Sequence, residues 1–292
     1  MTLNWKLPKA PGVPDQYRRT STPSPRNVYS VNLMLIVSTS TEELQSQLVE
    51  LGAVAQHRFP KWEPEVDSIV AVVEAHPADV HLALNLDCET NDVESLWYER
   101  IRPFEANLRL QKRAHRRLQP LISPPDATWT QQAERLIARL MSAIGTSALR
   151  IDHIGSTAVA GLPAKNLIDI QVVVDDLAMA LNLAEMSRRA GFVRVAGEWY
   201  GESRDGTKFR EEVSVDADPG RSANVNFRPQ ADPVWNEALM FRDFLRAHST
   251  ERDRYADMKR LLVTRSRDVD HYSELKMPYI TEALKRAKTT PL

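Results

Sequence analysis

Apolar and polar residues alternate most clearly between residues 126 and 190. A three- and four-residue spacing of apolar side chains predicts an amphipathic helix that begins at Asp126 or Thr128 and ends at Gly145. Strands are predicted over 148–154 and 167–174, and a helix capped by Asp175 or Asp176 then runs to about residue 190. The apolar positions of the first helix are Ala133, Leu136, Ile137, Leu140, Met141 and Ile144.

The remaining C-terminal pattern predicts further strands and then helices. Because helices and strands are mixed along the chain, we expect an α+β domain with a mixed β-sheet flanked by helices. The predicted strands lie near 192–199, 209–215 and 223–228, and the predicted helices near 232–248, 251–264 and 277–288.

The N-terminal third is less clearly patterned. Residues 1–30 contain five prolines among polar residues, which predicts a mobile tail. Residues 31–92 predict a small α/β segment, with a strand at 31–37, a short helix at 41–51 and an apolar run at 69–73 that fits either a strand or a helix.

A helical linker is predicted over residues 93–118, with one apolar stripe and a break or kink at Pro103. Its end, RLQKRAHRR at 109–117, carries five Lys or Arg residues that could attract phosphate groups, but a solvated linker face is the favoured interpretation because no aromatic platform accompanies the run. The stripe needs a surface to cover it.

Composition excludes several classes of protein. With 38 Lys and Arg against 39 Asp and Glu, no net field favours nucleic acid, and the single Cys88 excludes an intrachain disulfide. The longest apolar stretch near the start, at 33–37, is too short to span a membrane. We therefore expect a cytoplasmic protein with no membrane partner and no strong nucleic-acid signal.

The candidate chemistry lies in HIGSTAVAGLPAKNLIDIQVVV, residues 153–174. A Gly-Ser turn after a strand leaves backbone N–H groups unobstructed for a triphosphate, and Asp169 on the next strand could hold Mg²⁺. Lys165 adds a positive charge. Asp169 could instead cap a turn or pair with Lys165 or Arg228.

This block resembles the signature of the GrpB family, whose domain has a nucleotidyltransferase-like fold. The likeness extends from about Leu121 to Leu284 and includes ADPGRSANVNFRP and WNEALMFRDFLRAH, which predicts a domain over 119–288. Upstream, LWYERIRPFEANL resembles the junction at which a dephospho-CoA kinase domain is fused in front of a GrpB domain in actinobacterial proteins. Residues 31–92 would then be a degenerate remnant of that kinase.

The resemblance implies roles for particular residues. Gly155, Ser156 and Thr157 match the phosphate-binding turn together with Lys165, and Asp169 matches the first catalytic and metal-binding carboxylate. The second acid is replaced by Gln171, whose amide oxygen can ligate Mg²⁺ without contributing charge. A third acid stays open among Glu211, Glu212, Asp216 and Asp218.

The kinase motif itself is missing. No G-x-x-x-x-G-K-S/T occurs in the sequence, and its nearest approach, GESRDGTK at 201–208, predicts a loop that leads into a strand. We expect no dephospho-CoA phosphorylation by this chain alone.

Two hypotheses follow. The domain binds a nucleoside triphosphate through Mg²⁺ with weak or no nucleotidyl transfer, or it is a noncatalytic accessory module that docks on a protein partner through the stripe at 93–108.

Overall fold

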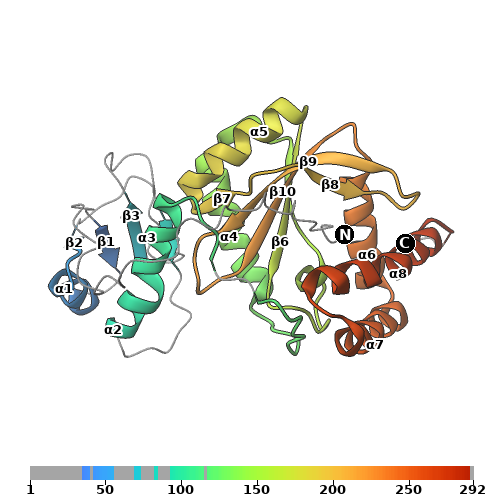
Figure 1. Cartoon of the computed structure of the whole chain (residues 1–292), viewed down its shortest axis with the longest axis horizontal. Coiled ribbons are helices and arrows are strands. Elements are labelled where there is room, and N and C mark those ends of the chain that lie inside the picture. Colours follow the sequence, from blue (N-terminus) through green and yellow to red (C-terminus); the bar gives the residue numbers. More distant parts are fainter. Residues whose placement is uncertain are drawn as a thin grey trace, which may run out of the picture.

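The computed structural model describes two β-sheets joined by a helical segment (Figure 1). The predicted mobile tail at 1–30 lies outside the described residues and stays a prediction. Cys88 also lies outside them. None of the helices in the described ranges combines the length and apolar character of a membrane span. The described residues are 35–39, 42–55, 69–73, 82–84, 93–114 and 117–289.

The smaller sheet has four strands in the order β2-β1-β3-β4. Strand β1 pairs in parallel with β2 and antiparallel with β3. The apolar run at 69–73 is therefore a strand and not a helix, and the predicted helix at 41–51 is confirmed as α1. The elements are β1 (Leu35–Thr39), α1 (Glu42–Glu50), β2 (Val54–Ala55), β3 (Ile69–Val73) and β4 (Leu82–Leu84).

The joining segment consists of α2 (Val93–Ser95), a π-helix (Leu96–Ile101) and α3 (Arg102–Arg109). The break expected at Pro103 takes the form of the π-helical turn that precedes it, because proline lacks an N–H and its ring clashes with the carbonyl four residues earlier. Pro103 itself lies in the first turn of α3.

The apolar stripe of this segment is covered by the chain itself. Its side chains form one buried cluster with residues from the α1 region and from the large sheet. Arg100 also donates two hydrogen bonds to Asp218, at 2.9 and 2.8 Å. The stripe therefore gives no reason to expect a docked partner. The cluster contains Leu48, Ala53, Leu96, Trp97, Ile101, Phe104, Leu108, Val193 and Ala217.

The larger sheet is mixed, as predicted, with strand order β5-β6-β10-β9-β7 and β8 paired to β9. Strand β6 runs antiparallel to β5 and parallel to β10. The GESRDGTK stretch forms the β8–β9 hairpin, which confirms that it is not a phosphate-binding kinase loop. The strands are β5 (Arg150–Ile154), β6 (Ile168–Val174), β7 (Phe192–Arg194), β8 (Trp199–Glu202), β9 (Lys208–Asp216) and β10 (Ala223–Pro229).

Helices α4 (Trp129–Ile144) and α5 (Leu177–Met186) cover one face of this sheet and enclose the main core. Gly145 ends α4 with a positive φ, and the Asp176 side chain caps α5 by accepting from the Met179 N–H, both as predicted. One-turn 3-10 helices, Gly145–Ser147 and Ser187–Ala190, follow α4 and α5.

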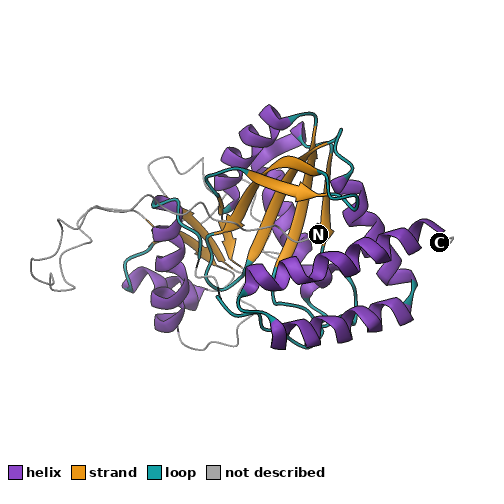
Figure 2. Cartoon of the chain, turned by 45° about the vertical axis from the view of Figure 1, so that its right-hand side comes forward, coloured by secondary structure: helices purple, strands orange, loops and turns teal. Residues whose placement is uncertain are grey.

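The three C-terminal helices are α6 (Val234–Ala247), α7 (Ser249–Arg265) and α8 (Val269–Thr289), which pack together on the other side of the sheet (Figures 1 and 2). Helix α8 starts eight residues before the predicted position, at 269 rather than 277. Pro278 lies inside α8 and does not start it, because burial of Tyr272 and Ile280 on one face outweighs the loss of one hydrogen bond.

Candidate functional site

The site lies on the polar face of the large sheet. Alternate residues of β6 point to opposite faces, so Ile168 and Ile170 enter the helix-covered core while Asp169 and Gln171 lie on the other face. The register pairs Asp169 with Asn224 of β10 and Gln171 with its Asn226. Polar side chains from two parallel strands are thus placed side by side.

The Gly-Ser turn packs directly against Asp169. Gly155 has φ +73°, and a Cβ atom there would lie 2.7 Å from Asp169 Oδ2. Only glycine allows this backbone conformation together with so close an approach. Ser156 then begins a single 3-10 turn, Ser156–Ala158, and Asn224 Nδ2 donates to Asp169 Oδ1 at 3.1 Å.

Three lysines converge on this turn and on Asp169. They come from the loop before β6 and from helices α7 and α8, and two of them are almost fully buried, with 1% of Lys259 and 5% of Lys276 exposed. We call this small cavity the lysine pocket. It is lined by Gly155, Ser156, Lys165, Leu167, Asp169, Phe241, Tyr255, Lys259, Tyr272 and Lys276.

Aromatic rings support the lysine ammonium groups. The Lys276 and Lys165 nitrogens lie 4.8 and 5.5 Å from the centre of the Tyr272 ring, and Lys259 lies 4.8 Å from that of Tyr255. The Tyr255 hydroxyl is hydrogen-bonded to Ser156. Cation–π contacts stabilise the protonated form of a lysine without neutralising it, so these rings favour the charge that an anionic ligand would meet.

Burial and nearby positive charges lower the pKa values of the two buried lysines, Lys259 and Lys276. Burial, followed by the charges of Arg260 and Lys165, lowers the pKa of Lys259 to about 7. Burial also lowers the pKa of Lys276 well below its usual value, with Lys165 and Lys259 adding to the effect. Lys259 donates to the Pro163 carbonyl. An anion in the pocket would raise both pKa values, because it stabilises the protonated amines.

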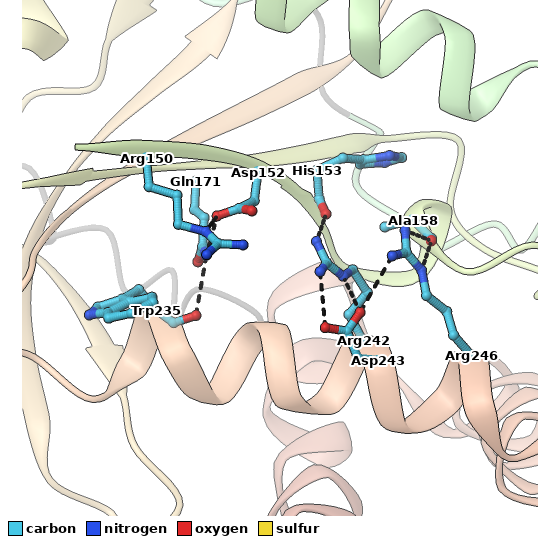
Figure 3. A network of polar contacts seen from close by, with 9 residues as sticks. All are labelled: Arg150, Asp152, His153, Ala158, Gln171, Trp235, Arg242, Asp243 and Arg246. Atoms are coloured by element: carbon cyan, nitrogen blue, oxygen red, sulfur yellow. Dashed lines mark hydrogen bonds and ion pairs between the residues drawn. The ribbon is translucent and has the colours of Figure 1, made fainter. Parts of the chain in front are cut away.

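Two arginines of α6 hold both ends of the Gly-Ser turn (Figure 3). Arg242 donates to the His153 carbonyl at 3.0 Å, and Arg246 donates twice to the Ala158 carbonyl, at 3.0 and 2.8 Å. Asp243 pairs with both guanidinium groups. The backbone of the turn is therefore fixed from outside the pocket.

Thr157, predicted to bind phosphate, is not among the residues that line the lysine pocket. Its hydroxyl donates to the Leu167 carbonyl at 3.2 Å and lies 3.0 Å from His153 Nε2. Burial, together with the charges of Arg246 and Arg242, lowers the pKa of His153 to about 4, so this imidazole is neutral at physiological pH. Thr157 joins the turn to β5 and β6.

Gln171 is likewise directed elsewhere. Its side chain is fully buried, its oxygen accepts from Arg228 at 2.9 Å, and its nitrogen donates to Asp152 and to the Trp235 carbonyl. A cation bound to this oxygen would also face the guanidinium group of Arg228. The geometry gives no support to the predicted role of Gln171 as a metal ligand.

The four candidates for a third acid each form an ion pair away from Asp169. No group of three or more His, Cys, Asp or Glu side chains within the described ranges is arranged to hold a metal. The charged residues that line the lysine pocket together with Asp169 are therefore the three lysines. The ion pairs join Glu211 to Arg228, Glu212 to Arg194, Asp216 to Arg139 and Asp218 to Arg100.

Sequence reasoning missed Lys259 and Lys276. A usable signal exists, because each lysine follows a buried tyrosine by four residues on the apolar face of its helix, after Tyr255 in α7 and Tyr272 in α8. A lysine at such a position cannot reach solvent easily and needs a polar partner or an anion.

Comparisons with known proteins agree with the likeness seen in the sequence. The GrpB protein family model matches residues 119–286. A dephospho-CoA kinase of Mycolicibacterium paratuberculosis is 37% identical over 212 residues, which cover 66% of this chain and 52% of the kinase. The chain thus spans about half the length of that relative.

Two further matches are a UPF0157 protein and a solved GrpB structure. A UPF0157 protein of Halalkalibacterium halodurans is 33% identical over 56% of this chain and 80% of its own length. The crystal structure of GrpB from Enterococcus faecalis, 22% identical, covers 58% of this chain and 98% of its own, with a TM-score of 0.46. Since the family model matches more than half of the sequence, this chain belongs to the GrpB family.

Proposed function

We propose that this protein binds the phosphate groups of a nucleotide in the lysine pocket and carries out little or no nucleotidyl transfer. The observation that supports binding is the convergence of Lys165, Lys259 and Lys276 on Ser156 beside a single carboxylate. Buried charges of one sign are costly unless an ion of the opposite sign neutralises them, and phosphate groups carry several negative charges.

The residues around Asp169 do not fit a two-metal centre. Two-metal transfer needs carboxylates that hold both ions, whereas here one carboxylate lies among three lysines. Magnesium in proteins is often held by one carboxylate together with the substrate phosphates. Asp169 can therefore supply one ligand to a Mg²⁺ ion that accompanies the nucleotide, and the lysines supply the remaining neutralisation.

Calorimetric titration with ATP tests this proposal. We expect ATP to bind in EDTA, because the lysines do not depend on a metal, and Mg²⁺ to add a smaller gain in affinity that Asp169→Asn abolishes. Asp176→Asn, which changes a carboxylate at the cap of α5 and outside the lysine pocket, is the matched control and should keep that gain. Absence of binding at millimolar ATP, with and without Mg²⁺, would refute the proposal.

A further inference from the structure

A second and larger cavity opens next to the lysine pocket. It has a volume of about 470 Å³, within the range of small-molecule sites, and it shares Lys165, Leu167 and Asp169 with the lysine pocket. We call it the sheet-edge cavity. It lies where β6 and β10 begin and β9 ends, and its lining includes residues 113–114, residues within 117–123 and the loop 219–222.

The cavity contains two buried asparagines whose oxygens have no hydrogen-bond partner in the described part of the chain. Asn224 is 6% exposed and Asn226 is 3% exposed. Their amide nitrogens donate to Asp169 Oδ1 and to the Ile170 carbonyl, which fixes the orientation of both amides. Both Oδ1 atoms lack a donor. An unsatisfied buried acceptor is costly, so these oxygens are suited to donors supplied by a ligand.

Outside the lysine pocket, the cavity is lined by three arginines and by one carboxylate, Asp216, which is paired with Arg139 at 2.9 Å, so positive charge predominates. Arg221 donates to neutral oxygens, those of Gln132 at 2.6 Å and Asn166 at 2.8 Å. Arg113 and Arg117, from the basic run at 109–117, also line the cavity. This charge disfavours an ammonium donor, so the donors that suit the two asparagines are hydroxyl groups on a negatively charged ligand.

We infer that the sheet-edge cavity binds the sugar of the nucleotide whose phosphates occupy the lysine pocket, with sugar hydroxyls donating to Asn224 and Asn226. The inference rests on the proposed function, and it identifies the ligand as a ribonucleotide rather than free phosphate. The two cavities meet at Asp169 and Lys165, so one molecule can occupy both.

Three probes separate the two halves of the site in calorimetric titrations. Tripolyphosphate reports on phosphate binding without a sugar, ATP on phosphate and sugar together, and 2′,3′-dideoxy-ATP on the contribution of the hydroxyls. We expect ATP to bind about ten-fold more tightly than dideoxy-ATP, the loss that one or two hydrogen bonds predict. Tripolyphosphate should bind more weakly than ATP despite its higher charge.

Variants then assign the effect to the cavity. Asn226→Val should reduce the difference between ATP and dideoxy-ATP, because only the Asn224 acceptor remains, and it should leave tripolyphosphate binding unchanged. The exposed Arg189→Gln should change none of the three affinities. Equal affinities of ATP and dideoxy-ATP for the unmodified protein overturn the inference even if Asn226→Val fails to fold. Binding of none of the three ligands overturns the proposed function as well.

Discussion

The two ends of the polar face of the large sheet differ in how their buried charges are balanced. Where β6 and β10 begin, Asp169 faces three lysines that outnumber it. Two rows further along the same strands, Arg228 and Glu211 form a 2.7 Å ion pair in which each side chain is 2% exposed. Asn224 and Arg228 are alternate residues of β10, and Glu211 comes from the neighbouring strand β9, yet only the first end has unbalanced charge.

The difference shows how buried charge reveals function. A buried ion pair surrounded by hydrogen bonds is balanced and serves the fold, and removing one partner is costly because the other charge is left alone. A buried group of like charges beside a cavity is unbalanced, and a ligand of opposite charge completes it. We therefore expect substitutions at the Arg228 end to change stability and substitutions at the lysine end to change binding.

The largest expected effect is at the balanced end. Arg228→Met should lower the free energy of unfolding by about 3–5 kcal/mol, because Glu211 is left buried without its partner. Chemical denaturation measures this change. The double variant Arg228→Met with Glu211→Leu should recover most of the stability; a single variant as stable as the unmodified protein would show that the pair is not structural.

Gly155, in the turn beside Asp169, is expected to matter for stability although it lines the lysine pocket. Gly155→Ala should lower the free energy of unfolding by about 2–4 kcal/mol, the sum of the cost of a positive φ and of the clash with Asp169 Oδ2. Gly206→Ala is the control, because Gly206 has φ +86° but no atom within 4 Å of the added Cβ. Equal losses in the two variants would contradict the close approach of Asp169 to the turn.

At the unbalanced end, Lys276→Met should weaken tripolyphosphate binding by about 10–100-fold, the loss expected for one charged hydrogen bond. The variant should be at least as stable as the unmodified protein, because a buried amine is replaced by an apolar side chain. Lys285→Met, on the exposed side of α8, should change neither property. Unchanged binding in Lys276→Met would remove this lysine from the site.

The smallest expected effect concerns pH. The pKa of Lys259 is about 7 in the free protein, and a bound anion raises it, so binding takes up a proton above pH 7. Tripolyphosphate affinity should fall about five-fold between pH 7 and pH 8, as the protonated fraction of Lys259 falls. Lys259→Met should make this profile less steep and leave the part that Lys276 contributes. A flat profile for the unmodified protein would mean that Lys259 keeps its ordinary pKa or lies outside the site.

The sequence predicts the parts of the fold that depend on local patterns. The spacing of Leu136 and Leu140, the Asp176 cap and the alternation around Asp169 give α4, α5 and β6 nearly as observed. The predicted start of α8, near 277, is eight residues too late, because tertiary burial extends the helix through Pro278 in a way that the local pattern does not indicate.

The sequence predicts only part of the candidate site, because some of its residues come together only in the tertiary structure. Gly155, Ser156, Lys165 and Asp169 lie within fifteen residues of one another, and the structure brings them to one pocket. Lys259 and Lys276 come from helices about a hundred residues later, so no local spacing connects them to the turn. The directions of the Thr157 and Gln171 side chains depend on His153 and Arg228, which sequence distance does not reveal.

A crystal structure of the protein with ATP tests the central claim most directly. The account predicts phosphate oxygens within hydrogen-bond distance of Lys276 Nζ and Ser156 Oγ. It also predicts that Arg228 and Glu211 stay paired as they are without ligand. ATP bound at another surface, with the lysine pocket free of phosphate at saturating concentration, would contradict the account.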